Sequence, residues 1–337
     1  MIGEKKGHFQ GLSRGDGPVC PSKELTVMNL SSLRLTWNRP KRQYPVPLRV
    51  RLMRRQWAKN DARRDRGLTT PEEVLRRDDL SYAGGEVWNR LDLYRPKGAA
   101  GPLPVIVSIH GGGYFYGSKE VYQYYCMDLA RRGFAVVNFN YRLAPEFRYP
   151  APLEDTNALL TWLCAHDGEL AVDRNNVFLV GDSAGAQLAS QYAAAWANPD
   201  YAGLLGLEIP AFRLAAVGLN CGMYRLDDWV LGSSLAPMAR DYLGPEPTIY
   251  GEQLDVLGHI GGNYPPAYLV SAPNDFLAPQ CQPMAVFLQG KGVEAQWKLY
   301  GTLEQKEVGH VFHVNLSLPE AKQANDEETD FFRKFIR

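Results

Sequence analysis

Short apolar segments alternate with longer amphipathic segments from about residue 86 to the end of the chain. Residues 86–96 alternate apolar and polar side chains, as a half-buried strand does. Further strands are predicted at 104–109, 134–141, 176–183, 214–221, 265–275 and 294–301, and helices at 121–133, 153–166, 184–197, 282–292 and 321–337. Apolar strands that alternate with helices predict an α/β fold with a mainly parallel central sheet flanked by helices.

The first 80 residues do not follow this alternation. Residues 48–57 interleave arginines with apolar side chains, which is typical of a helix with one solvated face. Residues 71–77 also predict a helix, because Thr70 is a suitable N-cap and Pro71 suits the first helical position. We therefore expect residues 1–80 to form a segment distinct from a main domain at 81–337. The alternation breaks again at about 224–262, which indicates an insertion.

Composition and charge narrow the classes of partner. The chain has 337 residues, 45% of them apolar, and its 37 Lys and Arg balance its 37 Asp and Glu, so no net positive field favours nucleic acid. The arginine-rich stretch from Arg39 to Arg77 leaves a nucleic-acid-binding arm as an alternative, but the interleaved apolar residues favour a packed helix. No apolar run reaches the ~18 residues that a membrane span needs, so we expect no stable membrane insertion.

Cysteine usage points to the cellular compartment. The five cysteines are odd in number and scattered, with no C-x-x-C pair, and the opening residues do not resemble a secretory signal. This pattern predicts reduced thiols in a cytoplasmic protein rather than a disulfide framework or a zinc site.

The sequence "GDSAG" at 181–185 lies between a predicted strand and a predicted helix. A serine forced onto a sharp strand-to-helix turn needs small neighbours, and its hydroxyl then projects from the carboxyl end of the sheet. Ser183 is therefore the candidate nucleophile, with a helix-capping serine as the alternative.

The sequence "HGGG" at 110–113 directly follows another predicted strand. It lacks the G-K-[ST] and G-x-G-x-x-G patterns of phosphate-binding loops. Backbone N–H groups that are free of side chains suit the binding of an oxyanion, and the N–H after the nucleophile supplies another donor. We expect donors from Gly112, Gly113 and Ala184, with Gly111 as a hinge and His110 orienting the loop.

A serine nucleophile needs a base and an acid that orients the base. Among the histidines after Ser183, His310 follows the last strand in a loop, His313 remains an alternative base, and His259 lies in the insertion. Asp275 follows the strand before, where the orienting acid is expected, although a turn or helix-capping role is an alternative.

Together these residues resemble the hormone-sensitive lipase family of α/β-hydrolases. The matching blocks are "HGGGYFYG" at 110–117, "NYRLAPEFRYPAPLED" at 140–155, "GDSAG" at 181–185, "PNDFL" around Asp275 and "GHVFH" at 309–313. The resemblance implies an α/β-hydrolase fold with a triad of Ser183, Asp275 and His310. It implies an oxyanion hole from Gly112, Gly113 and Ala184, and no metal or organic cofactor. It also implies a helical cap, built largely from the segment at 1–80 with help from the insertion, and buried or half-buried ion pairs at Arg142 and Glu146.

The chain departs from the family pattern at Ala186, at Pro279 and Gln280, and at Val311. None of these departures removes a reacting group. The resemblance implies a serine carboxylesterase that hydrolyses short- to medium-chain acyl esters, a class of small molecule, through an acyl-enzyme on Ser183. A carbohydrate acetylesterase, lactonase or amidase on the same triad is the alternative. A non-catalytic, ligand-binding protein of this fold is less favoured because His310 is present.

Aromatic residues offer both pocket walls and packing surfaces. Tyr114, Phe115 and Tyr116 follow the glycines, and Trp57 and Trp229 lie in the expected cap, so each suits either the pocket or the core. The C-terminal aromatic residues Phe331, Phe332 and Phe335 suit either the core or a homodimer contact.

Overall fold

The computed structural model describes residues 44–225 and 236–337. The chain divides into two units, residues 1–38 and 39–337, and every described residue lies in the second. Trp229 and Cys20 lie outside the described residues, as does the part of the expected cap before residue 44. The described cysteines are free thiols.

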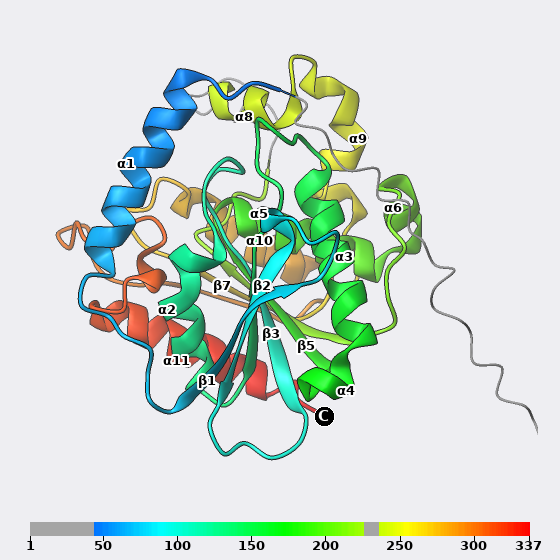
Figure 1. Cartoon of the computed structure of the whole chain (residues 1–337). Helices are drawn as coiled ribbons and strands as arrows, with labels where there is room; N and C mark the ends of the chain where they lie inside the picture. The colour runs from blue at the N-terminus through cyan, green and yellow to red at the C-terminus, as the bar shows by residue number, and fades with distance from the viewer. Residues whose placement is uncertain (1–43, 226–235) are drawn as a thin grey trace, which may run out of the picture. The chain divides into compact units, whose positions relative to one another are not determined.

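An eight-stranded sheet organises the second unit (Figure 1), with the order β1-β2-β4-β3-β5-β6-β7-β8. The strands are β1 Val74–Ser81, β2 Arg90–Pro96, β3 Leu103–Ile109, β4 Ala135–Phe139, β5 Val172–Asp182, β6 Leu214–Asn220, β7 Ala267–Ser271 and β8 Ala295–Leu299. β2 runs antiparallel to β1 and to β4, and the pairings from β4 through β8 are parallel. The predicted α/β fold with a mainly parallel central sheet is therefore confirmed.

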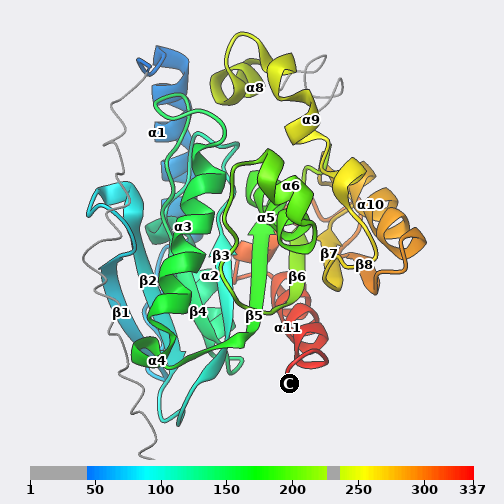
Figure 2. The same ribbon diagram turned by 90° about the vertical axis from the view of Figure 1, so that its right-hand side faces the viewer.

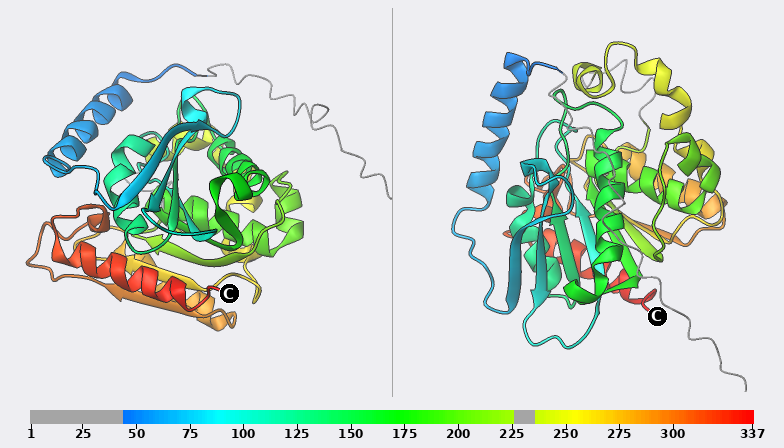
Figure 3. Two further views of the ribbon diagram at one scale, coloured as in Figure 1. Left: turned by 60° about the horizontal axis from the view of Figure 1, so that its bottom comes forward. Right: turned by 45° about the vertical axis from the view of Figure 1, so that its right-hand side comes forward.

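Helices cover both faces of the sheet (Figures 2 and 3). The helices are α1 Leu48–Arg64, α2 Lys119–Ala130, α3 Ala151–Ala165, α4 Asp167–Leu170, α5 Ala184–Ala197, α6 Pro199–Leu204, α8 Ala236–Leu243, α9 Gly251–Leu254, α10 Ala278–Gly290 and α11 Pro319–Arg333. Short 3-10 turns are η2 Val87–Asn89, η3 Pro247–Tyr250, η4 Leu257–His259 and η5 Phe312–Val314.

Alternating side chains of the strands divide the core into two layers. On β3, Val105 and Val107 join the cluster that includes residues of α3, α5 and α10. Ile106, between them, joins the cluster that includes residues of α2 and α11. Because both faces are covered, β4, β6 and β7 are buried along their whole length, which is why they were visible in the sequence. Phe331 and Phe332 are buried within this second layer of the chain itself.

The predicted helix at residues 71–77 is wrong. β1 pairs with β2 from Val74 opposite Pro96 to Ser81 opposite Arg90. Only Val74 of β1 is buried, so its many polar residues belong to an edge strand rather than to the exposed face of a helix. Backbone hydrogen bonds to a neighbouring strand decide this conformation, and local capping signals do not encode them. The sheet thus begins before residue 81, where the main domain was expected to start. The predicted strand at 86–96 is likewise shorter, because its first residues form η2.

Two arginines of α1 pair with acids elsewhere in the fold. Arg49 binds Asp241 of α8 through both guanidinium Nη atoms. Arg54 binds Glu146 with two contacts of 2.8 Å, and donates further bonds to the carbonyls of Phe115 and Ala144. These pairs fasten α1 to the hydrolase domain, at the end of the sheet where the parallel strands terminate (Figures 1 and 2). They account for two arginines of the basic stretch without a nucleic-acid partner.

Candidate active site

Ser183 occupies a strained turn between β5 and α5. Its φ is 52° and its ψ is −116°, and its N–H donates to Asn220 O at 2.9 Å. A Cβ at Gly181 would lie 2.3 Å from Gly185 O, and a Cβ at Gly185 would lie 2.0 Å from Ile109 O. Only glycine fits at these two positions, so the "GDSAG" spacing follows from the close approach of the helix to the strands.

The three predicted catalytic side chains form one hydrogen-bonded line. His310 Nε2 lies 3.0 Å from Ser183 Oγ, and His310 Nδ1 lies 2.7 Å from Asp275 Oδ1. Asp275 follows β7, and His310 lies in the loop after β8. The two loops are held together by a parallel bridge between Asn274 and Gly309. Distant segments therefore meet at the carboxyl edge of the sheet, as the resemblance implied.

Asp275 is oriented by more than the imidazole. It accepts a hydrogen bond from Ser271 Oγ at 2.6 Å and another from the Leu277 N–H at 2.9 Å. Burial alone would raise the pKa of Asp275, but the hydrogen bond and charge of His310, together with these two donors, lower that pKa below its usual value. The carboxylate therefore stays ionised beside the imidazole.

The glycine loop presents backbone donors to the site. Gly112 and Gly113 have φ values of 108° and 59°. Within the described part of the chain, no protein acceptor takes a hydrogen bond from the N–H of Gly112, Gly113 or Ala184. A Cβ at Gly112 would lie 2.1 Å from Tyr116 O, so the loop tolerates no side chain at this position. Unpaired N–H groups beside a nucleophile are the arrangement that binds an oxyanion.

Asp182 supports the glycine loop from below. It accepts the Gly111 N–H at 3.1 Å and the Tyr122 hydroxyl at 2.7 Å. A Cβ at Gly111 would lie 2.4 Å from Asp182 Oδ2, so the loop rests on the carboxyl. Burial raises the pKa of Asp182 to about 6. Asp182, the residue before Ser183, therefore positions the loop that carries the N–H groups of Gly112 and Gly113.

His110 orients the loop without taking part in the triad. Its ring is buried, stacks on Tyr141 at a centroid distance of 4.1 Å, and lies 2.8 Å through Nδ1 from Gly111 O. Burial lowers the pKa of His110 to about 4, so the ring is neutral near pH 7.

The other candidate histidines lie away from the serine. His313 is buried against Tyr125, and burial lowers the pKa of His313 to about 3. His259, which lies in η4, stacks on Tyr201 of α6. Neither hydrogen bonds to Ser183, so the structure brings only His310 to the nucleophile among the described histidines.

A cavity of about 610 Å³ opens onto the serine. It is lined by Trp57, Asn60, Asp61 and Arg64 of α1, by Gly112, Gly113, Tyr116, Val121, Tyr122, Asp182, Ser183, Phe276, His310 and Val311, and by Met238 of α8. Helices from the segment before β1 and from the insertion between β6 and β7 thus contribute walls. Met238 approaches the oxyanion loop closely, since a Cβ at Gly113 would lie 2.3 Å from its Cε.

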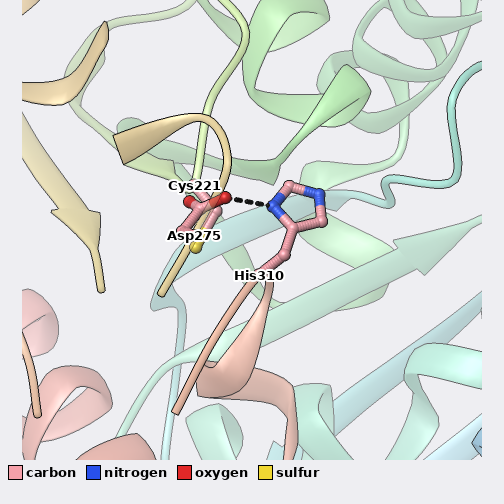
Figure 4. A group of neighbouring side chains, drawn as sticks. All are labelled: Cys221, Asp275 and His310. Carbon is pink, nitrogen blue, oxygen red and sulfur yellow. Dashed lines mark hydrogen bonds and ion pairs between the residues drawn. The ribbon is translucent and has the colours of Figure 1, made fainter. Parts of the chain in front are cut away.

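Cys221 lies beside the Asp275–His310 pair (Figure 4). The ligand atoms of the three residues are all within 4.8 Å of one another, which resembles a metal site. Hydrogen bonds account for the grouping, because Cys221 Sγ accepts the Val311 N–H at 3.3 Å and Asp275 already binds His310. Burial raises the pKa of Cys221 well above its usual value, which disfavours the thiolate that binds metals. Cys221 therefore acts as support for the histidine loop.

Two of the departures from the family pattern, Val311 and Gln280, have local explanations. Val311 takes a left-handed φ of 55°, which is unusual for a β-branched residue, and the Cys221 contact holds its N–H. Gln280 Oε1 accepts the N–H groups of Tyr224 and Arg225, so it anchors the chain after β6.

Arg142 pairs with Asp155, and Glu146 with Arg54, so the ion pairs expected at these positions are present and largely buried.

Several residues of the site carried no recognisable signal in the sequence. Tyr122, Ser271, Cys221, Asp61, Arg64 and Met238 reach the site only through the tertiary fold. Of the aromatic residues considered, Trp57 and Tyr116 line the cavity. Tyr114 is core, because it is buried and stacks on Tyr242 at 3.8 Å.

Known proteins resemble this chain in sequence and in structure. The α/β-hydrolase-fold profile matches residues 106–314. Crystalline esterase B from Lactobacillus rhamnosis superposes with a TM-score of 0.79 at 27% identity, covering 85% of this chain and 94% of that one, and was also crystallised with a tributyrin phosphonate inhibitor. The acetyl esterase of Salmonella typhi is 26% identical over 277 residues, 78% of this chain and 80% of the enzyme.

The first curated relatives are matched over a smaller share. The versiconal hemiacetal acetate esterase of Dothistroma septosporum is 37% identical over 102 residues, 30% of this chain and 31% of the relative. Esterase LipC of Mycobacterium tuberculosis is 26% identical over 204 residues, 60% of this chain and 45% of the relative. The chain thus spans about a third to a half of these curated relatives. Because the profile covers well over half of the chain, the protein belongs to the hormone-sensitive lipase-like family of α/β-hydrolases, as its motifs predicted.

Proposed function

We propose that the protein is a serine carboxylesterase that hydrolyses short- to medium-chain acyl esters. The observation that carries this proposal is the line from Asp275 through His310 to Ser183, beside N–H groups that have no protein acceptor. The same line argues against a non-catalytic, ligand-binding role, because each group that the reaction needs lies within hydrogen-bonding distance of the next.

The geometry supports a two-step reaction. His310 Nε2 takes the proton from Ser183 Oγ as this oxygen attacks the ester carbonyl, and the N–H groups of Gly112, Gly113 and Ala184 bind the resulting oxyanion. The C–O bond to the alcohol breaks, His310 returns its proton to the alkoxide, and an acyl-enzyme remains. Water then attacks with His310 as base, which releases the carboxylic acid and restores Ser183.

The size of the cavity supports substrates of modest length. A volume of about 610 Å³ is in the range of small-molecule sites. Relatives include an acetyl esterase, and the similar esterase B was crystallised with an inhibitor derived from tributyrin. We also propose that α1 and α8 form part of a cap over this cavity.

Separate observations bear on the cellular location of the protein and on its association with membranes. The free thiols among the described cysteines support the cytoplasmic location expected from their spacing. In the part of the chain that the structure describes, no helix has the length and apolar character needed to cross a membrane.

A panel of p-nitrophenyl esters from acetyl to palmitoyl tests the function. We expect kcat/KM to be highest for short and medium chains, and to fall by more than about 10⁴-fold in Ser183→Ala. Ser317→Ala, at an exposed serine, is the matched control. A fluorophosphonate should add one label to wild type and none to Ser183→Ala, measured by intact-protein mass. Unchanged ester cleavage by Ser183→Ala would refute the proposal, and sugar acetates, lactones and anilides in the same panel distinguish the alternative leaving groups.

A further inference from the structure

A second cavity lies behind the oxyanion loop. Its volume is about 590 Å³. Its lining includes Ala58, Val87, Trp88, Phe115, Tyr116 and Phe147. Apolar and aromatic residues make up most of its walls, and the lining residues Arg54 and Glu146 pair with each other through two contacts. Arg55, Ser118 and Asn140 add polar groups to the lining. The reaction proposed above makes no use of this space.

Tyr116 is the one described residue that lines both this cavity and the catalytic cavity. Its ring meets Trp57 edge to face at a centroid distance of 5.5 Å, and its hydroxyl donates to Asp61 Oδ2. Asp61 is in turn held by Arg64, whose guanidinium also binds Val121 O at 2.8 Å. The ring is therefore fixed on its apolar side by an aromatic contact and at its tip by an ion-pair cluster.

The Tyr116 ring forms a wall on the acyl side of the scissile carbonyl. The leaving alcohol must lie at His310 Nε2 to receive its proton, where Phe276 and Val311 flank the imidazole. Tyr116, in contrast, lies three residues after Gly113, and its N–H donates to Gly112 O at 3.0 Å. An acyl chain that extends past the oxyanion hole, away from His310, is therefore directed at the Tyr116 ring.

We propose that Tyr116 sets the upper limit of acyl-chain length by closing the catalytic cavity off from the second, apolar cavity. This inference rests on the proposed esterase function. In wild type the chain stops at the phenol ring. Without that ring the two cavities, which have similar volumes, join into one continuous space.

The experiment compares acyl-chain profiles of four proteins, using p-nitrophenyl esters from butanoyl to dodecanoyl. Tyr116→Ala removes the wall, whereas Tyr116→Phe keeps the ring and loses only the bond to Asp61. We expect the dodecanoyl-to-butanoyl ratio of kcat/KM to rise at least about tenfold in Tyr116→Ala, since each methylene newly buried is worth up to about fourfold. Tyr116→Phe should keep the wild-type ratio.

Ala58 supplies the control for the second cavity. It lines that cavity alone and its side chain is exposed, so Ala58→Phe refills the space without disturbing the core. The double variant Tyr116→Ala with Ala58→Phe should return the ratio toward that of wild type. This reversal distinguishes use of the second cavity from general loosening of the site, which Ala58→Phe would not repair.

The outcomes separate the two proposals. If Ser183→Ala is inactive but the ratio is the same in Tyr116→Ala as in wild type, the inference about Tyr116 is wrong and the esterase function stands. A shift seen only with alkyl acetates of increasing alcohol length would overturn the assignment to the acyl side. If Ser183→Ala keeps full activity, the esterase function itself fails.

Discussion

Glu328 of α11 is a carboxyl group buried against the strand that supports the nucleophile. Its side chain is only 1% exposed, and its Oε1 accepts Asn220 Nδ2 at 3.0 Å. The same Asn220 accepts the N–H of Ser183 through its carbonyl. Among the described residues, no partner reaches Glu328 Oε2. Burial raises the pKa of Glu328 to about 8, so the side chain is neutral in the folded protein at pH 7.

The raised pKa sets the sign of the effect on stability. Below pH 4.5 both the folded and the unfolded chain hold the proton, so Glu328 contributes no pH dependence. Between pH 4.5 and about 8 the unfolded chain releases the proton and the folded chain keeps it. The free energy of unfolding therefore falls by about 1.4 kcal/mol for each pH unit in this window. Above about pH 8 the penalty is complete and constant.

Glu328→Gln removes this titration while keeping the shape of the side chain and an oxygen for Asn220. From pH 5 to pH 8 we expect wild type to lose about 4 kcal/mol of unfolding free energy relative to the variant. The other buried acids with raised pKa values, Asp155 and Asp182, titrate in both proteins and cancel in the difference. Urea unfolding followed by tryptophan fluorescence at four pH values measures the difference.

The neighbouring residue provides the control. Glu327 binds Lys298 at 2.6 Å at the surface, and its partners lower the pKa of Glu327 to about 2 although burial opposes this. It is ionised in both states across pH 5 to 8, so Glu327→Gln should shift stability by a constant amount in this range. Parallel stability curves for wild type and Glu328→Gln would refute the reasoning, because they would mean that Glu328 is ionised in the folded state.

Two further predictions concern the oxyanion loop. Gly112→Ala should lower kcat by about 10²–10³-fold, because its Cβ would lie 2.1 Å from Tyr116 O and displace the donors; fluorophosphonate labelling and kcat for p-nitrophenyl acetate measure the loss. Asp182→Asn should lower kcat/KM about tenfold or more with a smaller loss of stability, because a single amide oxygen replaces the two carboxylate acceptors for Gly111 and Tyr122. Gly84→Ala, on an exposed loop, is the matched control for the glycine, and activity equal to wild type in either loop variant would contradict the assigned geometry.

The alternation of apolar and amphipathic segments was sufficient to predict the parallel core of the fold. The central strands β3, β4, β6 and β7 are mostly apolar because helices cover both faces of the sheet, whereas the edge strand β8 is largely exposed. The turn at Ser183, the proposed nucleophile, and the glycine loop were also predictable, because close backbone approach at Gly181, Gly185 and Gly112 excludes side chains and leaves glycine in the sequence. The order of serine, acid and histidine along the chain then limited the remaining choices.

Other features depended on contacts between distant segments, which leave no local pattern. β1 reads as a helix from its own residues and is a strand because β2 offers it hydrogen bonds. Cys221 and Ser271 support the triad through single bonds whose partners are far along the chain or indistinguishable from ordinary core residues. The sequence by itself determined which chemical groups the protein carries and at which strand ends. The tertiary structure alone decided the supporting contacts and the place of Tyr116 between two cavities, because cavity shape depends on how separate elements pack together.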